Sequence, residues 1–192
     1  MPASQRNRSA PRKSGGGRQP AGLVAALRRI RLLLCDVDGV LTDASIYIGG
    51  AEEVKRFNIL DGLGLVAMRN QGLKVGWISS RPSPATARRA QELKIDFLRQ
   101  EKGSKVMIVE QLLAQAGLAW DEVCYVGDDV VDVGPMRCAG VAVAVANAVP
   151  EAQGAADYVT VATGGNGAVR EVVELILKAQ GKWAAVLAGH GA

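Results

Sequence analysis

From Ile30 onward the sequence alternates apolar, strand-like runs with segments of helical spacing, and this alternation constrains the fold more than any other feature. Continuous apolar runs are typical of strands that are covered on both faces, whereas apolar residues three and four positions apart are typical of helices. We expect strands at residues 31–37, 74–79, 96–98, 123–127, 141–146 and 158–161, and helices at residues 61–70, 85–93, 104–116, 130–137 and 168–179. This pattern predicts an α/β fold with a Rossmann-like, doubly wound parallel sheet, whose functional sites lie at the carboxyl ends of the strands.

One segment interrupts the alternation. Residues 45–58 read SIYIGGAEEVKRFN, which predicts two short strands around Gly49-Gly50 and therefore a β-hairpin inserted after the first strand. The apolar Ile46 and Ile48 suit an oligomer surface, and an ordinary satellite pair of strands is the alternative.

Charge is unevenly distributed along the chain. Residues 1–31 carry eight of the 23 basic residues and no acidic one, which leaves 15 basic and 19 acidic residues for the rest. We expect residues 1–25 to form a disordered basic tail, residues 26–182 a single domain, and residues 183–192 a flexible C-terminal tail. A nucleic-acid-binding arm and a transit peptide are alternatives for the basic tail, but a solvated tail is favoured and no nucleic-acid partner is expected.

Two further features bear on the compartment. No apolar run approaches the ~20 residues that a membrane-spanning helix needs, so no membrane association is expected. Cys35, Cys124 and Cys138 share no metal-ligand spacing, and the first two lie in apolar strand-like runs. Reduced, buried thiols in a cytoplasmic protein fit this pattern best.

Acidic residues follow two of the predicted strands. Asp36 and Asp38 end the first strand in the segment DVDGVLTD, and Asp128, Asp129 and Asp132 follow the strand at residues 123–127. Both strand ends open on the same edge of a parallel sheet, so the five carboxylates would repel one another strongly without a cation. Oxygen ligands favour Mg²⁺ over zinc. An ordinary Asp-Gly turn after the first strand, and helix capping by one acid of the second group, are the structural alternatives.

A hydroxyl group and a base complete the constellation. The strand at residues 74–79 ends in Ser79, followed by Ser80 and Arg81, and a strand-end hydroxyl with the amides after it can hold a phosphoryl oxygen. Capping of the next helix is an equal alternative for Ser79. Lys105, in the first turn of a predicted helix, can neutralise a phosphate or a nucleophile, and a solvated surface charge is the alternative for both Lys102 and Lys105.

In this order, the four elements resemble the motifs of the haloacid dehalogenase superfamily over about residues 30–182. The resemblance implies that Asp36 attacks phosphorus to form an aspartyl phosphate. It implies that Asp38 protonates the leaving oxygen and then activates water, with Ser79 and Lys105 in the remaining catalytic positions.

The same resemblance implies a metal site. A Mg²⁺ ion would be bound by Asp36, the backbone carbonyl of Asp38 and Asp128, with Asp129 and Asp132 as supporting residues around these ligands.

Superfamily members usually select substrates with a cap domain, but the spacings between Asp36, Ser79 and Asp128 leave no room for one. Within this capless branch the chain resembles the phosphatases of 3-deoxy-D-manno-octulosonate 8-phosphate, on the segments CDVDGVLTD, IYIG, KRFNILDGLG, YVGDDVVD and GAVREV. The resemblance implies a phosphorylated sugar acid as the substrate and a role in lipopolysaccharide precursor synthesis. It also implies a homotetramer whose hairpins assemble together and whose subunits complete one another's sites.

Substrate contacts in that family map onto nine residues of this chain. They are Asn58, Ile59, Leu60, Asp61, Gly62, Ser80, Arg81, Arg89 and Lys105. Arg81 and Arg89 suit a carboxylate, because a guanidinium group binds it bidentately, and exposed helix positions are the alternative for both. Similar phosphatases of a nine-carbon sugar acid 9-phosphate carry Glu at the position of Arg81 and Lys at that of Glu92, so both positions favour the eight-carbon acid.

Three features depart from the family pattern. Ser79-Ser80 replaces a usual Thr-Gly pair, and Val66 and Asn166 stand where an Arg is common. These departures leave a nine-carbon sugar acid 9-phosphate or another small sugar phosphate as alternative substrates. A non-catalytic assembly partner is a remote alternative, because the full catalytic set is present. A phosphoacceptor signalling domain ranks low, because such domains lack the D-x-D pair.

Overall fold

The computed structural model describes residues 21–49 and 52–189. The helices are α1 (Ala21–Leu27), α2 (Ile59–Asn70), α3 (Pro84–Glu92), α4 (Lys105–Ala116), α5 (Val133–Cys138), α6 (Pro150–Ala155), α7 (Ala168–Ala179) and α8 (Trp183–Ala188), with 3₁₀ turns η1 (Trp120–Glu122) and η2 (Val130–Asp132). The strands are β1 (Leu32–Cys35), β2 (Tyr47–Gly49), β3 (Glu52–Val54), β4 (Lys74–Ser79), β5 (Phe97–Gln100), β6 (Val123–Gly127), β7 (Val141–Ala144) and β8 (Tyr158–Val159). None of the described helices has the length and hydropathy that crossing a membrane requires.

Six strands form a parallel sheet in the order β5-β4-β1-β6-β7-β8. The chain places β4 and β5 on one side of β1 and then β6, β7 and β8 on the other, so the winding reverses between β1 and β6. Cys35 of β1 lies opposite Val126 of β6, which brings the residues after both strands to the same edge. Ligands of doubly wound sheets bind at such a reversal.

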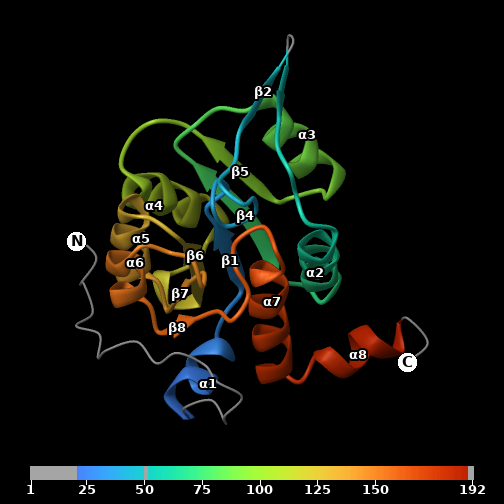
Figure 1. Cartoon of the computed structure of the whole chain (residues 1–192). Coiled ribbons are helices and arrows are strands. Elements are labelled where there is room, and N and C mark those ends of the chain that lie inside the picture. The colour runs from blue at the N-terminus through green and yellow to red at the C-terminus, as the bar shows by residue number, and fades with distance from the viewer. Residues whose placement is uncertain (1–20, 50–51, 190–192) are drawn as a thin grey trace.

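Helices cover both faces of the sheet. Helices α4, α5 and α6 lie on one side, and α2 and α7 lie on the other (Figure 1). Helix α7 packs there because one stripe of it is apolar and buried, formed by Val169, Val172, Val173, Ile176 and Leu177. Strand β1 is buried along its whole length, as expected for a strand covered on both faces.

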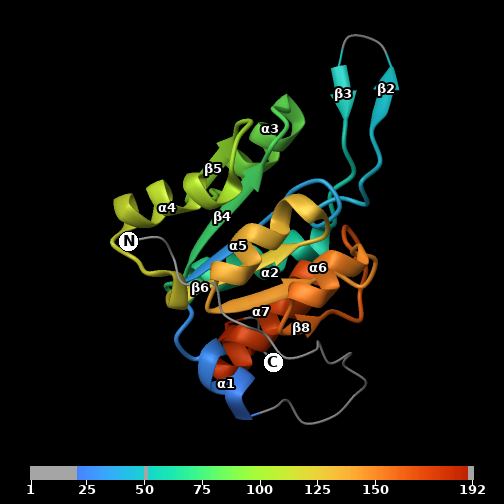
Figure 2. The ribbon, with the colours of Figure 1, turned by 90° about the vertical axis from the view of Figure 1, so that its left-hand side faces the viewer.

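The hairpin of β2 and β3 projects away from the sheet (Figures 1 and 2). The two strands are antiparallel, and Tyr47 pairs with Val54. Ile46, Tyr47 and Ile48 are 45, 53 and 91% exposed, so the hairpin presents an apolar surface to its surroundings. The predicted α/β fold and the inserted hairpin are confirmed, and no cap domain interrupts the described residues.

The predicted domain boundaries differ from the structure at both ends. Residues 21–25, which we expected in the basic tail, lie in α1, and the adjoining Leu27 and Ile30 are buried in the core. Residues 183–188, expected in the flexible C-terminal tail, form α8. The ring of Trp183 lies 5.1 Å from the guanidinium carbon of Arg170 and 5.5 Å from Nζ of Lys178. These cation–π contacts hold α8 against α7, but they could not be predicted because they involve residues of another helix. Residues 1–20 and 190–192 lie outside the described residues, so disorder there stays a prediction.

Candidate active site

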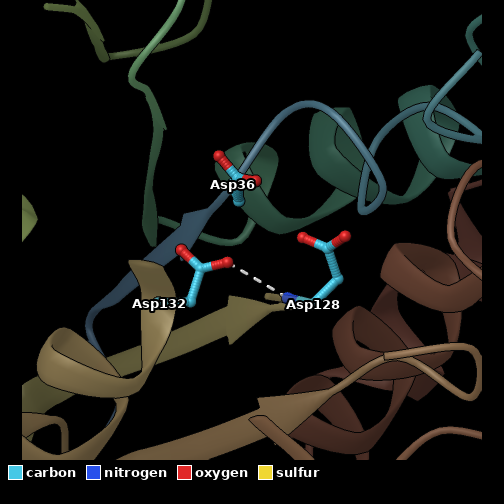
Figure 3. Close-up of side chains that lie close together, drawn as sticks. All are labelled: Asp36, Asp128 and Asp132. Carbon is cyan, nitrogen blue, oxygen red and sulfur yellow. Dashed lines mark hydrogen bonds between the residues drawn. The ribbon is translucent and has the colours of Figure 1, made fainter. Parts of the chain in front are cut away.

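Three aspartates meet where the winding of the sheet reverses. Asp36 directly follows β1, Asp128 directly follows β6, and Asp132 ends the 3₁₀ turn η2 just beyond (Figure 3). Each offers a carboxylate oxygen, and these oxygens lie within 4.8 Å of one another. The two predicted acidic groups therefore converge, as the parallel strand ends required.

Lys105 joins two of these acids. Its Nζ lies 2.7 Å from Oδ1 of Asp36 and 2.7 Å from Oδ1 of Asp132, and its side chain is buried. Burial alone would lower the pKa of the Lys105 ammonium group, but the two carboxylates raise it above its ordinary value. Lys105 therefore stays charged beside Asp36, and the solvated-lysine alternative is wrong for this residue, whereas Lys102 is exposed.

Both carboxylate oxygens of Asp132 accept hydrogen bonds from protein groups. Its Oδ1 accepts hydrogen bonds from Lys105 and from the Tyr125 hydroxyl at 2.8 Å, and its Oδ2 accepts from the amides of Asp128 at 3.1 Å and Asp129 at 3.4 Å. Because both oxygens are engaged, Asp132 positions Lys105 and the start of the loop after β6. This arrangement supports the predicted supporting role of Asp132.

Asp128 and Asp36 have the properties of ligands for a cation. Burial, with the charge of Asp36 next, raises the pKa of Asp128 to about 8, and burial, with the charge of Asp132 next, raises the pKa of Asp36 to about 6. Oδ1 of Asp128 is buried without a hydrogen-bond partner among the described residues. Clustered carboxylate oxygens with an unsatisfied member fit a hard divalent cation such as Mg²⁺. A side chain at Gly39, whose φ is 97°, would overlap the Asp128 carboxylate, so glycine is required beside it.

Asp129 lies apart from this cluster. Its side chain is exposed and accepts a hydrogen bond from the amide of Val130 at 2.6 Å, which caps the turn η2. The capping alternative therefore holds for Asp129, and its role near a metal stays a prediction.

The carboxylate of Asp38 lies between one residue of the predicted site, Arg81, and one residue outside it, Lys55. Nζ of Lys55 lies 2.6 Å from its Oδ1, and Nε of Arg81 lies 3.6 Å from its Oδ2. Lys55 follows β3, so the base of the hairpin reaches the active site. We did not predict a role for Lys55 or for Glu53. The only local signal is their spacing, because residues two positions apart in an extended segment point to the same side.

Ser79 stabilises the turn that follows β4. Its Oγ accepts a hydrogen bond from the amide of Arg81 at 3.1 Å and donates one to the Arg81 carbonyl at 3.0 Å. The helix-capping alternative is wrong for Ser79, because Ser83 caps α3 by accepting from the amide of Thr86. Ser80, partly exposed, lies in the same turn.

The two predicted substrate-binding arginines are both partly buried. Arg81 forms an ion pair with Glu53, and its Nη2 is buried without a hydrogen-bond partner among the described residues. Arg89 pairs with Glu92 at 2.8 Å and lies against the backbone of Gly62. The alternative that both are exposed helix residues is wrong: Arg81 lies in the turn before α3, and the side chain of Arg89, within α3, is only 14% exposed.

Residues 58–62 form the start of α2. Asn58 caps the helix by accepting from the amide of Leu60 at 2.7 Å, and Asp61 accepts from the amides of Gly167 and Arg170 at the start of α7. Ile59 and Leu60 are 66 and 55% exposed. Contact of these residues with substrate stays a prediction, but the carboxylate of Asp61 is already engaged within the fold.

Comparison with known proteins extends these observations. Residues 85–172 match the family model of haloacid dehalogenase-like hydrolases. The chain is 43% identical over 163 residues to the 3-deoxy-D-manno-octulosonate 8-phosphate phosphatase of Escherichia coli strain K12, a match that covers 84% of this chain and 87% of that protein.

Solved structures give the same result. The crystal structure of the 3-deoxy-D-manno-octulosonate 8-phosphate phosphatase from Moraxella catarrhalis, in complex with a magnesium ion, a phosphate ion and a KDO molecule, is similar with a TM-score of 0.85 at 38% identity, covering 88% of this chain and 97% of that one. The corresponding structure from Yersinia pestis has a TM-score of 0.83 at 41% identity and covers 85% of this chain and 89% of that one.

Proposed function

Because the chain belongs to the 3-deoxy-D-manno-octulosonate 8-phosphate phosphatase family of haloacid dehalogenase-like hydrolases, we propose that it removes the phosphate of that eight-carbon sugar acid. The product would serve in the synthesis of a lipopolysaccharide precursor. The observation that carries the proposal is the buried cluster of Asp36, Asp128, Asp132 and Lys105 at the reversal point of the sheet.

Asp36 is the nucleophile in this proposal. Its Oδ atom forms a bond to phosphorus while the bond from phosphorus to the sugar oxygen breaks, which gives an aspartyl phosphate. Lys105, 2.7 Å from Oδ1 of Asp36, orients the carboxylate and balances its charge.

Asp38 acts as the general acid and then as the general base in the two half-reactions. It gives a proton to the departing sugar oxygen, and then takes one from the water that attacks phosphorus and releases Asp36. Its carboxylate is 27% exposed, so it can reach a substrate at the edge of the sheet.

The magnesium that a relative contains fits the acidic groups of this chain. We assign its binding to Asp36, the backbone carbonyl of Asp38 and Asp128. When bound, the ion offsets the negative charge of the carboxylates and of the phosphate.

The sugar acid requires cationic contacts for its carboxylate. Arg81 is suited to this because its Nη2 is buried and unpaired among the described residues. We assign Arg89 and residues 58–62 to the same surface, since Arg89 lies against Gly62 at the start of α2. Ser80 and Lys105 would contact the phosphate end.

We also propose that the chain acts as a homotetramer in the cytoplasm. The exposed Ile46, Tyr47 and Ile48 give the hairpin an apolar surface that suits assembly with other hairpins. Cys35, Cys124 and Cys138 are buried and form no disulfide among the described residues, which is typical of a reducing compartment.

The test is phosphate release with Mg²⁺ from octulosonate 8-phosphate, a nonulosonate 9-phosphate and an aryl phosphate. We expect the highest kcat/KM on the eight-carbon ester and no detectable release by Asp36→Asn. A preference for the nine-carbon ester would refute the substrate assignment. Activity that survives Asp36→Asn would refute the aspartyl-phosphate route.

A further inference from the structure

Lys55 is a buried charged residue that the proposed reaction leaves unexplained. Its side chain is 0% exposed, and its Nζ donates to Oδ1 of Asp38 at 2.6 Å and to Oγ1 of Thr86 at 3.2 Å. Glu53 lies 3.9 Å away on the third side. Burying an ammonium group is costly unless it is paired, so the fold retains this cation for its contacts.

Two charged residues, Glu53 in β3 and Lys55 just after it, join the loop after β1 to the start of α3. Lys55 contacts Asp38 in the loop and Thr86 in the helix. Glu53 accepts a hydrogen bond from the Ser83 hydroxyl at 2.7 Å and pairs with Arg81. Both residues therefore face the active site from the hairpin.

The contact with Lys55 distinguishes the two oxygens of Asp38. Oδ1 accepts the short hydrogen bond from Lys55, whereas the cation beside Oδ2, Nε of Arg81, lies 3.6 Å away, beyond hydrogen-bond distance. Oδ1 therefore anchors the carboxylate, and Oδ2 is the oxygen left free for proton transfer. We propose that Lys55 is a positioning residue that fixes the Asp38 carboxylate, with Oδ2 directed to the leaving oxygen; this inference rests on the acid/base role of Asp38 in the proposed function.

Direct binding of substrate by Lys55 does not fit its surroundings. Three oxygen-bearing side chains, Asp38, Thr86 and Glu53, surround the ammonium group, and the side chain has no exposed surface. A substrate group could reach Lys55 only by displacing one of these partners. Lys55 therefore acts through Asp38.

The test compares Lys55→Met with wild type on two kinds of phosphate ester. Methionine keeps the apolar stem in a buried position and removes the charge. An alkyl ester, octulosonate 8-phosphate or glycerol phosphate, needs protonation of its leaving oxygen, whereas 4-nitrophenyl phosphate needs it far less. Because kcat/KM covers only the steps up to release of the alcohol, later hydrolysis of the aspartyl phosphate does not affect the comparison.

We expect Lys55→Met to lower kcat/KM on the alkyl esters about 10- to 100-fold and on the aryl ester less than about threefold. Lys178→Met, on the exposed last turn of α7, is the matched control and should change neither. In a double-mutant cycle, adding Lys55→Met to Asp38→Asn should cost less than about twofold on the alkyl esters, because the group that Lys55 positions is already lost.

Three results would overturn the inference. Equal losses on both kinds of ester, or additive losses in the cycle, would show that Lys55 only supports the fold. A raised KM at unchanged kcat would show that it binds substrate. The proposed substrate would be refuted separately, if the wild type were active on glycerol phosphate and the aryl ester but not on octulosonate 8-phosphate. The role of Lys55 would then still be tested by comparing glycerol phosphate with 4-nitrophenyl phosphate.

Discussion

Asp128 depends more on an added cation than its acidic neighbours do. Lys105 contacts Asp36 and Asp132, whose carboxylates thus have a protein cation within 2.7 Å. Asp128 receives no such contact among the described residues, one of its oxygens is unpaired, and burial raises its pKa to about 8. Without a metal this carboxyl therefore binds a proton more readily than an ordinary aspartate, and a bound Mg²⁺ would replace that proton.

The raised pKa of Asp128 predicts how magnesium and pH act together on stability. Above the ordinary pKa of the carboxyl group the folded state binds more protons than the unfolded state, so without metal the free energy of unfolding falls as the pH rises toward about 8. Magnesium offsets this loss. We expect Mg²⁺ to raise the melting temperature more near about pH 8 than near about pH 5, because protons compete with the metal.

Differential scanning calorimetry with EDTA or Mg²⁺ measures this effect. Asp128→Asn is the control, because an amide does not titrate, and it should lose most of the difference between the two pH values. An equal effect of Mg²⁺ at both pH values would contradict the assignment of Asp128 as a ligand.

The proposed catalytic role of the buried Lys105 can be tested against Lys102, a nearby lysine on the surface. Lys105→Met removes the cation beside the nucleophile, and we expect kcat to fall about 100- to 1,000-fold, as when one electrostatic contact to a reacting group is lost. Lys102→Met is the matched variant three positions earlier, exposed to solvent, and should retain activity. Steady-state phosphate release measures both, and similar losses in the two variants would contradict the geometry.

At the level of elements, strands and long helices were predictable because a strand covered on both faces leaves a continuous apolar run and a helix covered on one face leaves an apolar stripe. The run at residues 31–37 gave the strand β1, and the stripe of α7 gave its helix. The short α6 was not predicted, because its segment PEAQGA contains no large apolar residue to mark a buried face.

The contacts between elements were not predictable in the same way. Lys55 lies 17 positions from Asp38, and Glu53 lies 28 positions from Arg81, so no local period relates them. The acidic cluster was predictable because the topology alone brings the ends of β1 and β6 together. The position of the hairpin base depends on side-chain packing, which only the structure gives.

The loop before α7 supports the loop after β1 through a close glycine contact. A Cβ at Gly164 would overlap the backbone carbonyl of Gly39, and a Cβ at Gly165 would overlap the backbone carbonyl carbon of Thr42. We expect Gly164→Ala to destabilise the protein by about 1–3 kcal/mol and to lower activity, because the backbone near Asp38 must shift. Gly154→Ala, in open space in α6, should instead stabilise it by about 0.5–1 kcal/mol.

Chemical denaturation combined with kinetic assays distinguishes these two glycine variants. A loss of activity at unchanged stability in Gly164→Ala would still fit a displaced loop. Unchanged stability together with unchanged activity would show that the two loops do not support one another.

At the scale of the whole molecule, the hairpin would link the proposed assembly to the active site. Ile46, Tyr47 and Ile48 lie on and next to its strand β2, and the paired strand β3 with the residue after it brings Glu53 and Lys55 to Arg81 and Asp38. The sequence indicated the apolar surface but not this connection, because an oligomer is a property of several chains. If hairpins assemble together, their association steadies the residues that hold the acid/base group.

This connection predicts that breaking the assembly also weakens catalysis. Ile48→Asp places a charge on the most exposed of the described apolar residues of the hairpin, and we expect light scattering to report a smaller oligomer with kcat reduced about tenfold. Leu187→Asp, also exposed and located on α8 at the opposite end of the molecule from the hairpin (Figure 1), is the control and should keep both the mass and the activity of wild type. A dissociated Ile48→Asp with full activity would show that the hairpin base holds Asp38 without help from other subunits, and an unchanged mass would place the interface elsewhere.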